Sequence, residues 1–145
     1  WIKETFLKFK KKFKINKNIY IDRSESKFSH CQIINHLELK KYLKKKKFKI
    51  VKLASQSFAK QIYMFWNANC IIGAHGAALT NLVFSKPKTK VIELKPFRHP
   101  GKNYQRISKV NNLHYYSIES ERKYLKNKNG DIFVDLKKLD RKINL

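Results

Sequence analysis

Residues 69–84, which read NCIIGAHGAALTNLVF, constrain the fold of this chain more than any other stretch. The segment begins with an apolar run at Ile71 and Ile72, long enough for one buried strand, and breaks at Gly73 and Gly76. An alanine-rich segment follows, so the pattern predicts a strand, a glycine turn and the start of a helix. Such a turn directs unpaired backbone N–H groups and the positive end of a helix dipole to one point, where a phosphate can bind.

The glycines of this turn have two explanations. Gly76 would let an anion approach where a Cβ would block it. A short buried turn between strand and helix explains glycines almost as well. His75 favours the phosphate site, because a turn that only packs in a core does not need a histidine there.

Strands and helices are predicted to alternate along the chain. Apolar runs predict strands, and amphipathic segments with start signals predict helices between them. The predicted strands are 18–22, 48–53, the apolar run at Ile71 and Ile72, 89–94, 113–118 and a short one at 131–134. The predicted helices are 36–47 (Asn35 as N-cap, capping box with Glu38), 57–68 (Ser57 as N-cap; Phe58, Ile62, Phe65 and Trp66 inward), about 103–111, and one beginning near Asp135. This alternation predicts an α/β fold, a mostly parallel sheet with helices on both faces.

The first residues form a separate unit in this interpretation. Residues 2–13 place four apolar side chains, Ile2, Phe6, Phe9 and Phe13, at helical spacing. We therefore expect an amphipathic lead-in helix within residues 1–17, which packs on the lobe formed by residues 18–145 or on a further domain. Because the chain opens on Trp1, we expect it to be a piece of a longer product.

The charge of the chain is strongly positive but dominated by lysine. Its 145 residues include 34 Lys and Arg, of which five are Arg, and the formal net charge is +24. Lysine is a solvated point charge, whereas arginine grips phosphates with a planar fork. Non-specific binding to nucleic acid or to an anionic membrane surface is expected from this charge.

The cysteines and the hydropathy indicate a compartment. Cys31 and Cys70 have no CxxC spacing, so neither a disulfide framework nor a zinc site is expected. No apolar run reaches the roughly 18–20 residues of a membrane span. We therefore expect a cytoplasmic protein, with possible peripheral contact at the inner face of a membrane.

Three candidate site residues each follow or end a predicted strand. They are Arg23, His75 in the glycine turn, and Glu93, which lies 20 residues after Gly73. Since all strands of a parallel sheet end at one edge, the three are expected to converge. An arginine beside a helix start suits a diphosphate, and a carboxylate suits ribose hydroxyls. The G-x-x-G spacing differs from G-x-G-x-x-G, and no P-loop, GxSxG, HExxH or paired-carboxylate cluster is present.

A resemblance to a known family rests on five segments. They are Tyr20-Ile21-Asp22-Arg23, Ile34-Asn35-x-x-Glu38-Leu39, Ser57-Phe58-Ala59-Lys60-Gln61, Ile72 to Phe84 with its GAHGA-x-LTN core, and Val91-Ile92-Glu93-Leu94. In order and spacing they resemble glycosyltransferase family 61 over roughly residues 15–118. Asp22 stands where many members have Ser, and Lys60 where many have an acid.

The resemblance implies a GT-B architecture with two Rossmann-like lobes, of which this chain would be the C-terminal, donor-binding one. It implies metal-independent, inverting transfer, often from a UDP-sugar, to a glycan or glycoconjugate in polysaccharide biosynthesis, with no cofactor. Arg23 and the residues Gly73, His75, Gly76 and Ala77 would hold the diphosphate, and Asn81 and Glu93 would lie beside the nucleotide. His75 would stabilise the leaving diphosphate, whereas the catalytic base would belong to the other lobe.

Two other classes of function remain open at this point. The charge and the 13% aromatic content also fit a basic nucleic-acid-binding module, although the aromatics fall at core spacings. A nicotinamide-dependent enzyme is the third possibility, and the spacing of the glycines counts against it.

Overall fold

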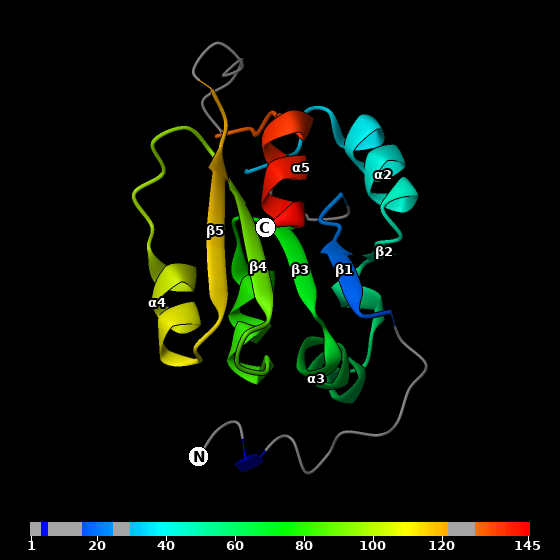
Figure 1. Cartoon of the computed structure of the whole chain (residues 1–145), viewed down its shortest axis with the longest axis vertical. Coiled ribbons are helices and arrows are strands. Elements are labelled where there is room, and N and C mark those ends of the chain that lie inside the picture. The colour runs from blue at the N-terminus through cyan, green and yellow to red at the C-terminus, as the bar shows by residue number, and fades with distance from the viewer. Residues whose placement is uncertain (1–3, 6–15, 25–29, 122–129) are drawn as a thin grey trace.

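The computed structural model describes residues 4–5, 16–24, 30–121 and 130–145, and these residues contain one five-stranded sheet (Figure 1). Its strands are β1 (Asn18–Ile21), β2 (Lys49–Val51), β3 (Cys70–Ala74), β4 (Lys90–Lys95) and β5 (His114–Glu119). All neighbouring pairs are parallel, in the order β2-β1-β3-β4-β5. The predicted α/β fold with a Rossmann-like, mostly parallel sheet is confirmed.

The strand order fixes where the chain changes direction across the sheet. From β1 the chain moves outward to β2, and then crosses back to place β3 on the other side of β1. Parallel α/β sheets bind ligands at such a switch point, outside the carboxyl ends of the strands. Here the switch point lies between β1 and β3, at the upper edge of the sheet in Figure 1.

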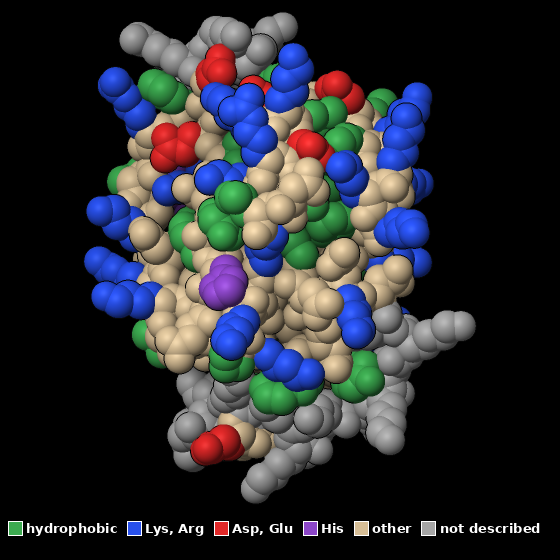
Figure 2. All heavy atoms as spheres, in the orientation of Figure 1, with side chains coloured by type: hydrophobic (Ala, Val, Ile, Leu, Met, Phe, Trp, Pro, Cys, Tyr) green, Lys and Arg blue, Asp and Glu red, His purple; other side chains and the backbone are tan. Residues whose placement is uncertain are grey.

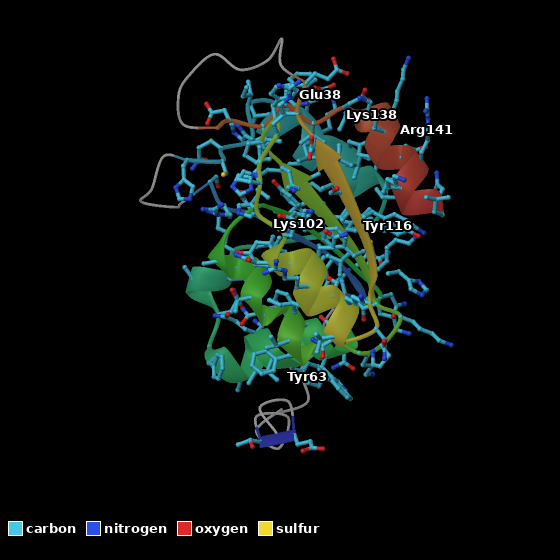
Figure 3. The ribbon with its side chains drawn as sticks, turned by 90° about the vertical axis from the view of Figure 1, so that its left-hand side faces the viewer. Glu38, Tyr63, Lys102, Tyr116, Lys138 and Arg141 are labelled. Atoms are coloured by element: carbon cyan, nitrogen blue, oxygen red, sulfur yellow. The ribbon has the colours of Figure 1, made fainter. Side chains whose placement is uncertain are left out.

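Helices cover both faces of the sheet, as predicted, because successive strand residues point to opposite faces. Tyr20 and Ile72 pack under α2 (His36–Lys45) and α5 (Leu136–Asn144) in one core cluster. Ile21 and Ile71 pack in a second cluster under α3 (Phe58–Asn67), η2 (Ala77–Phe84) and α4 (Asn103–Val110). Figure 3 shows these layers from the side, with α5, which carries Lys138 and Arg141, across the sheet from α4.

The predicted N-cap Ser57 is confirmed, and the helix predicted to begin near Asp135 begins there. The Ser57 side chain accepts a hydrogen bond from the backbone N–H of Lys60 at 3.4 Å, and α3 begins at the next residue. Asp135 Oδ1 accepts from the N–H groups of Lys137 and Lys138 at 2.8 and 3.0 Å, which starts α5.

The capping box at the start of α2 is wrong. Asn35 occupies the N-cap position, but its side chain makes no capping hydrogen bond to the helix. Instead Asn35 accepts from the N–H of Val134 and donates to the carbonyl of Val134, both at 3.0 Å. The backbone of Val134 therefore takes the side-chain hydrogen bonds of Asn35 that would otherwise cap α2. The helix also ends at Lys45, two residues before the predicted end.

Other boundaries differ for tertiary reasons. The predicted strand 48–53 is only three residues long, and one turn of 3-10 helix, η1 (Leu53–Ser55), follows it. The predicted strand 131–134 is a single bridge between Ile33 and Ile132. On α3, Phe58 is half exposed, and Met64, which was not predicted to face inward, is buried. The predicted helix 2–13 lies largely outside the described residues.

The surface over α2 and α5 carries charged side chains of both signs, with basic ones in the majority (Figure 2). Lys and Arg side chains are spread around this face, with Asp and Glu among them (Figure 2). Within the described residues, no helix combines the length and the apolar character that crossing a membrane requires.

Candidate functional site

Arg23 lies just after β1 and is joined to the turn after β3. Its Nη1 donates a hydrogen bond to the backbone carbonyl of His75, across the switch point of the sheet. The preceding residue, Asp22, is buried and pairs with Lys40 at 2.7 Å. Burial alone would raise the pKa of Asp22, but hydrogen bonds from Lys40 and Ser24 lower it below its usual value. The residue that precedes Arg23 is thus fixed by the ion pair of the Asp22 carboxylate with Lys40.

Residue 76 must be a glycine because the guanidinium of Arg23 fills the space that a side chain there would need. A Cβ built on Gly76 would lie 2.6 Å from Cζ of Arg23 and closer still to its Nη1, well inside contact distance. The φ angle of Gly76 is also +153°, a conformation that favours glycine. The sequence predicted that this glycine admits an anion, whereas in the structure the guanidinium of Arg23 occupies the space that the missing side chain leaves.

The segment after Gly76 is helical but is not an α-helix. Residues 77–84 form the 3-10 helix η2, in which the N–H of Leu79 bonds to the carbonyl of Gly76 at 3.0 Å. The helix predicted to start after the glycine turn is therefore present as a 3-10 helix. Ala77 is exposed as its first residue, and the N–H groups of a first helical turn have no partner within the helix. The turn thus still presents backbone donors beside Arg23.

His75 and Glu93 are in direct contact. His75 Nδ1 lies 2.5 Å from Oε1 of Glu93, whose side chain is only 1% exposed. The other carboxylate oxygen accepts a hydrogen bond from the hydroxyl of Tyr115 on β5. Burial and this bond both raise the pKa of Tyr115. Glu93 was predicted to lie beside the ribose, but in the structure its carboxylate points into the protein, because Tyr115 and His75 take up both of its oxygens.

Aromatic side chains hold the imidazole of His75 from two further directions. The ring of His99 lies 3.8 Å from it between centroids, and the ring of Tyr104 on α4 lies 5.2 Å away. The N–H of Gly101 donates to Nδ1 of His99 at 3.1 Å, which orders the loop 96–102. Burial lowers the pKa of His99, and the nearby charges of His75 and Lys95 lower it further.

The two remaining predicted residues, Gly73 and Asn81, lie in the framework of the site. Gly73 pairs in register with Glu93 and Ile21, and a Cβ on it would lie 3.1 Å from a methyl group of Leu79. Asn81 donates to Gln61 Oε1 at 2.9 Å, which ties η2 to α3. The structure thus brings Arg23, His75 and Gly76 together with Glu93. It places Gly73 in the core and Asn81 in a link between helices.

Sequence reasoning missed His99, Tyr104 and Tyr115. His99 follows a strand at the same sheet edge, and this position could have marked it. Tyr104 and Tyr115 match ordinary core spacing, so no local signal distinguishes them from packing residues.

Two surface pockets bear on what this edge can bind. A small pocket of about 170 Å³ is lined by three charged residues, Asp22, Arg23 and Lys52, and by four apolar ones, Ile21, Leu53, Ala54 and Ala78. A larger groove of about 590 Å³ follows the edge strand β2, and neither Arg23 nor His75 lines it. Among the described residues, no group of three or more His, Cys, Asp or Glu side chains is arranged to hold a metal ion.

The site offers positive and hydrogen-bonding groups without an exposed carboxylate. A guanidinium, an imidazole packed against two rings and the first backbone N–H groups of η2, which have no partner within the helix, meet at one edge. Such a combination suits an anion with several oxygens. A single-stranded nucleic acid would need a row of exposed aromatic rings. Among the strongly exposed large hydrophobic side chains of the described part of the chain, Phe58 is the only aromatic one.

Comparison with known proteins points to one family. A family model described as Glycosyltransferase 61 matches residues 1–92. Over 65 residues the chain is 35% identical to "Beta-1,2-xylosyltransferase RCN11" of Oryza sativa subsp. japonica, and over 66 residues it is 33% identical to "Beta-1,2-xylosyltransferase" of Arabidopsis thaliana. These segments cover 45% and 46% of the chain and 12% of each relative. The matched region is thus a small part of the relatives' length.

Proposed function

The chain belongs to glycosyltransferase family 61, and from this premise we propose that its lobe binds the diphosphate of a nucleotide-sugar donor for glycosyl transfer. UDP is the proposed nucleotide. One observation carries the proposal: the guanidinium of Arg23 and the turn at His75 and Gly76 meet at the switch point of a parallel sheet. Ligands of doubly wound sheets bind at this position.

The proposed mechanism assigns charge stabilisation to this lobe. When the bond between the sugar and the diphosphate breaks, negative charge develops on the leaving diphosphate. Arg23 and the imidazole of His75 are fixed before the reaction, so they can stabilise that charge without reorganising. We propose inverting transfer to a glycan or glycoconjugate hydroxyl, with the base that deprotonates this hydroxyl supplied by a second lobe of a GT-B architecture.

Titration calorimetry with UDP on the 145-residue chain tests the proposal. Arg23→Ala and His75→Ala each remove one charged or polar contact to the diphosphate. We expect each to weaken binding by about 1.5–3 kcal/mol, or roughly ten- to 150-fold. Arg98→Ala is the matched control, because Arg98 is exposed in the loop after β4 and contacts the ring of Phe97 instead of the turn.

The control separates a specific site from the attraction of a basic chain. If Arg98→Ala weakens UDP binding as much as Arg23→Ala, the affinity comes from net charge and the proposed site is wrong. Uridine, which lacks the diphosphate, should bind the wild-type chain far more weakly than UDP. Equal binding of uridine and UDP would show that Arg23 and His75 do not hold phosphate.

A further inference from the structure

Three side chains form an unbroken chain of hydrogen bonds beneath the turn. The hydroxyl of Tyr115 on β5 donates to Oε2 of Glu93 on β4, and Oε1 of Glu93 lies 2.5 Å from Nδ1 of His75. The chain thus joins the end of β3 to the two strands that follow it in the sheet. The exposed fraction of the side chain is 1% for Glu93 and 15% for His75.

Packing does not explain a carboxylate at this position. Glu93 shares its sheet row and its face with Ile21 and Gly73, next to an apolar core cluster. A carboxylate taken out of water there costs several kcal/mol unless its oxygens find partners. Its partners are the imidazole of His75 and a phenol hydroxyl. An apolar side chain would pack equally well at this position of the sheet. We therefore assign the carboxylate its role in the contact with the imidazole of His75.

The contact also determines which ring nitrogen of His75 carries a proton. An ionised carboxylate can only accept, so the proton between Glu93 and His75 belongs to Nδ1. Nε2 has no hydrogen-bond partner among the described residues. The rings of His99 and Tyr104 pack against the imidazole and limit its rotation.

We propose that Glu93 and Tyr115 are positioning residues, which keep the Nδ1–H of His75 directed at the carboxylate and leave Nε2 facing the donor diphosphate, to which it donates a hydrogen bond when both ring nitrogens carry a proton. The second half of this statement rests on the proposed function. The first half concerns the protein without ligand. Because Tyr115 holds the carboxylate from the far side, its hydroxyl acts on the ligand only through two other side chains.

The test measures the tautomer of His75 by ¹⁵N NMR on the ligand-free chain and the affinity for UDP by calorimetry. Glu93→Leu removes the acceptor of Nδ1–H, and Tyr115→Phe removes only the hydroxyl that orients that acceptor. Tyr104→Phe is the matched control, since its hydroxyl bonds to Thr80 and not to Glu93.

We expect the wild-type nitrogen shifts to show the proton on Nδ1. Glu93→Leu should release the ligand-free ring from this tautomer. It should weaken UDP binding by about ten- to 100-fold, because the doubly protonated ring that donates Nε2–H to the diphosphate then lacks the carboxylate that orients it, as the loss of orienting partners weakens metal-bound imidazoles. Tyr115→Phe should shift the same nitrogens less and weaken binding by about threefold to tenfold. Tyr104→Phe should leave the nitrogen shifts of His75 unchanged.

The outcomes separate this inference from the proposed function. Wild-type shifts in both Glu93→Leu and Tyr115→Phe would overturn the positioning role, even if Arg23→Ala abolishes UDP binding. Altered shifts with unaltered UDP affinity would overturn the contact at Nε2. If the wild-type chain binds no UDP, the proposed function and the Nε2 contact both fail, and the shifts alone decide the positioning role. Tyr115→Phe carries the test by itself if Glu93→Leu does not fold.

Discussion

Substituting Gly76 by alanine should disable the site through Arg23 and not through direct contact with ligand. The new Cβ would lie 2.6 Å from Cζ and 3.1 Å from Nη2 of the guanidinium, so the arginine must leave its place. It then loses its hydrogen bond to the carbonyl of His75, an interaction of a charged donor that contributes about 1.5–3 kcal/mol. Holding alanine at a φ of +153° costs about another 1–3 kcal/mol of stability.

These two costs appear in different measurements. The free energy of unfolding, from denaturant titration, should fall by roughly 2.5–6 kcal/mol in Gly76→Ala as the sum of both costs. UDP affinity of the folded fraction should fall about as far as in Arg23→Ala. Gly130→Ala is the matched control, since Gly130 also has positive φ (+69°) but its nearest contact is the ring of Pro96. That variant should lose stability and keep its UDP affinity.

A double-mutant cycle decides whether the glycine acts through the arginine. If it does, adding Gly76→Ala to Arg23→Ala should change the free energy of UDP binding by less than about 0.5 kcal/mol. Additive losses would refute the reasoning, because they would mean that Gly76 contacts the ligand by itself. Wild-type affinity in Gly76→Ala alone would show that the guanidinium does not need this space.

Further predictions concern the supports of the fold. Asp135→Ala should lower the free energy of unfolding by about 1 kcal/mol through the lost cap of α5. Hydrogen bonds from backbone N–H groups keep the pKa of Asp135 below its usual value in the folded protein. The stabilisation is therefore present above the pKa of the unfolded state and lost as the pH falls through the pKa of the folded state. Denaturant titrations at neutral and acid pH should show the stability difference between wild type and Asp135→Ala shrinking in acid. Ile72→Ala, in the fully buried centre of β3, should cost about 2–5 kcal/mol by the same measurement, and a smaller loss would mean that the core collapses around the cavity. Asn81→Ala should lower stability by about 1 kcal/mol through the lost bond to Gln61. A drop in UDP affinity at unchanged stability would instead place Asn81 at the ligand.

Much of the framework follows from signals that act within a few residues. Apolar runs and caps such as Ser57 and Asp135 operate over one helical turn or one strand, so they can be recognised without knowing the fold. The meeting of Arg23 with the turn at His75 was also predictable, because parallel strands end at one edge and both residues follow strands.

What the tertiary structure alone decided is how the side chains at that edge pair with one another. The carboxylate of Glu93 turns inward because the register of β5 places Tyr115 within reach. The side-chain amide of Asn35 bonds to the backbone of Val134 instead of capping α2, because the chain returns beside it. The partners of these bonds are 22 and 99 residues apart. Periodicity and capping patterns describe only residues that are close in sequence, so they cannot predict these pairs. A buried polar group pairs with whichever partner the folded chain brings next to it.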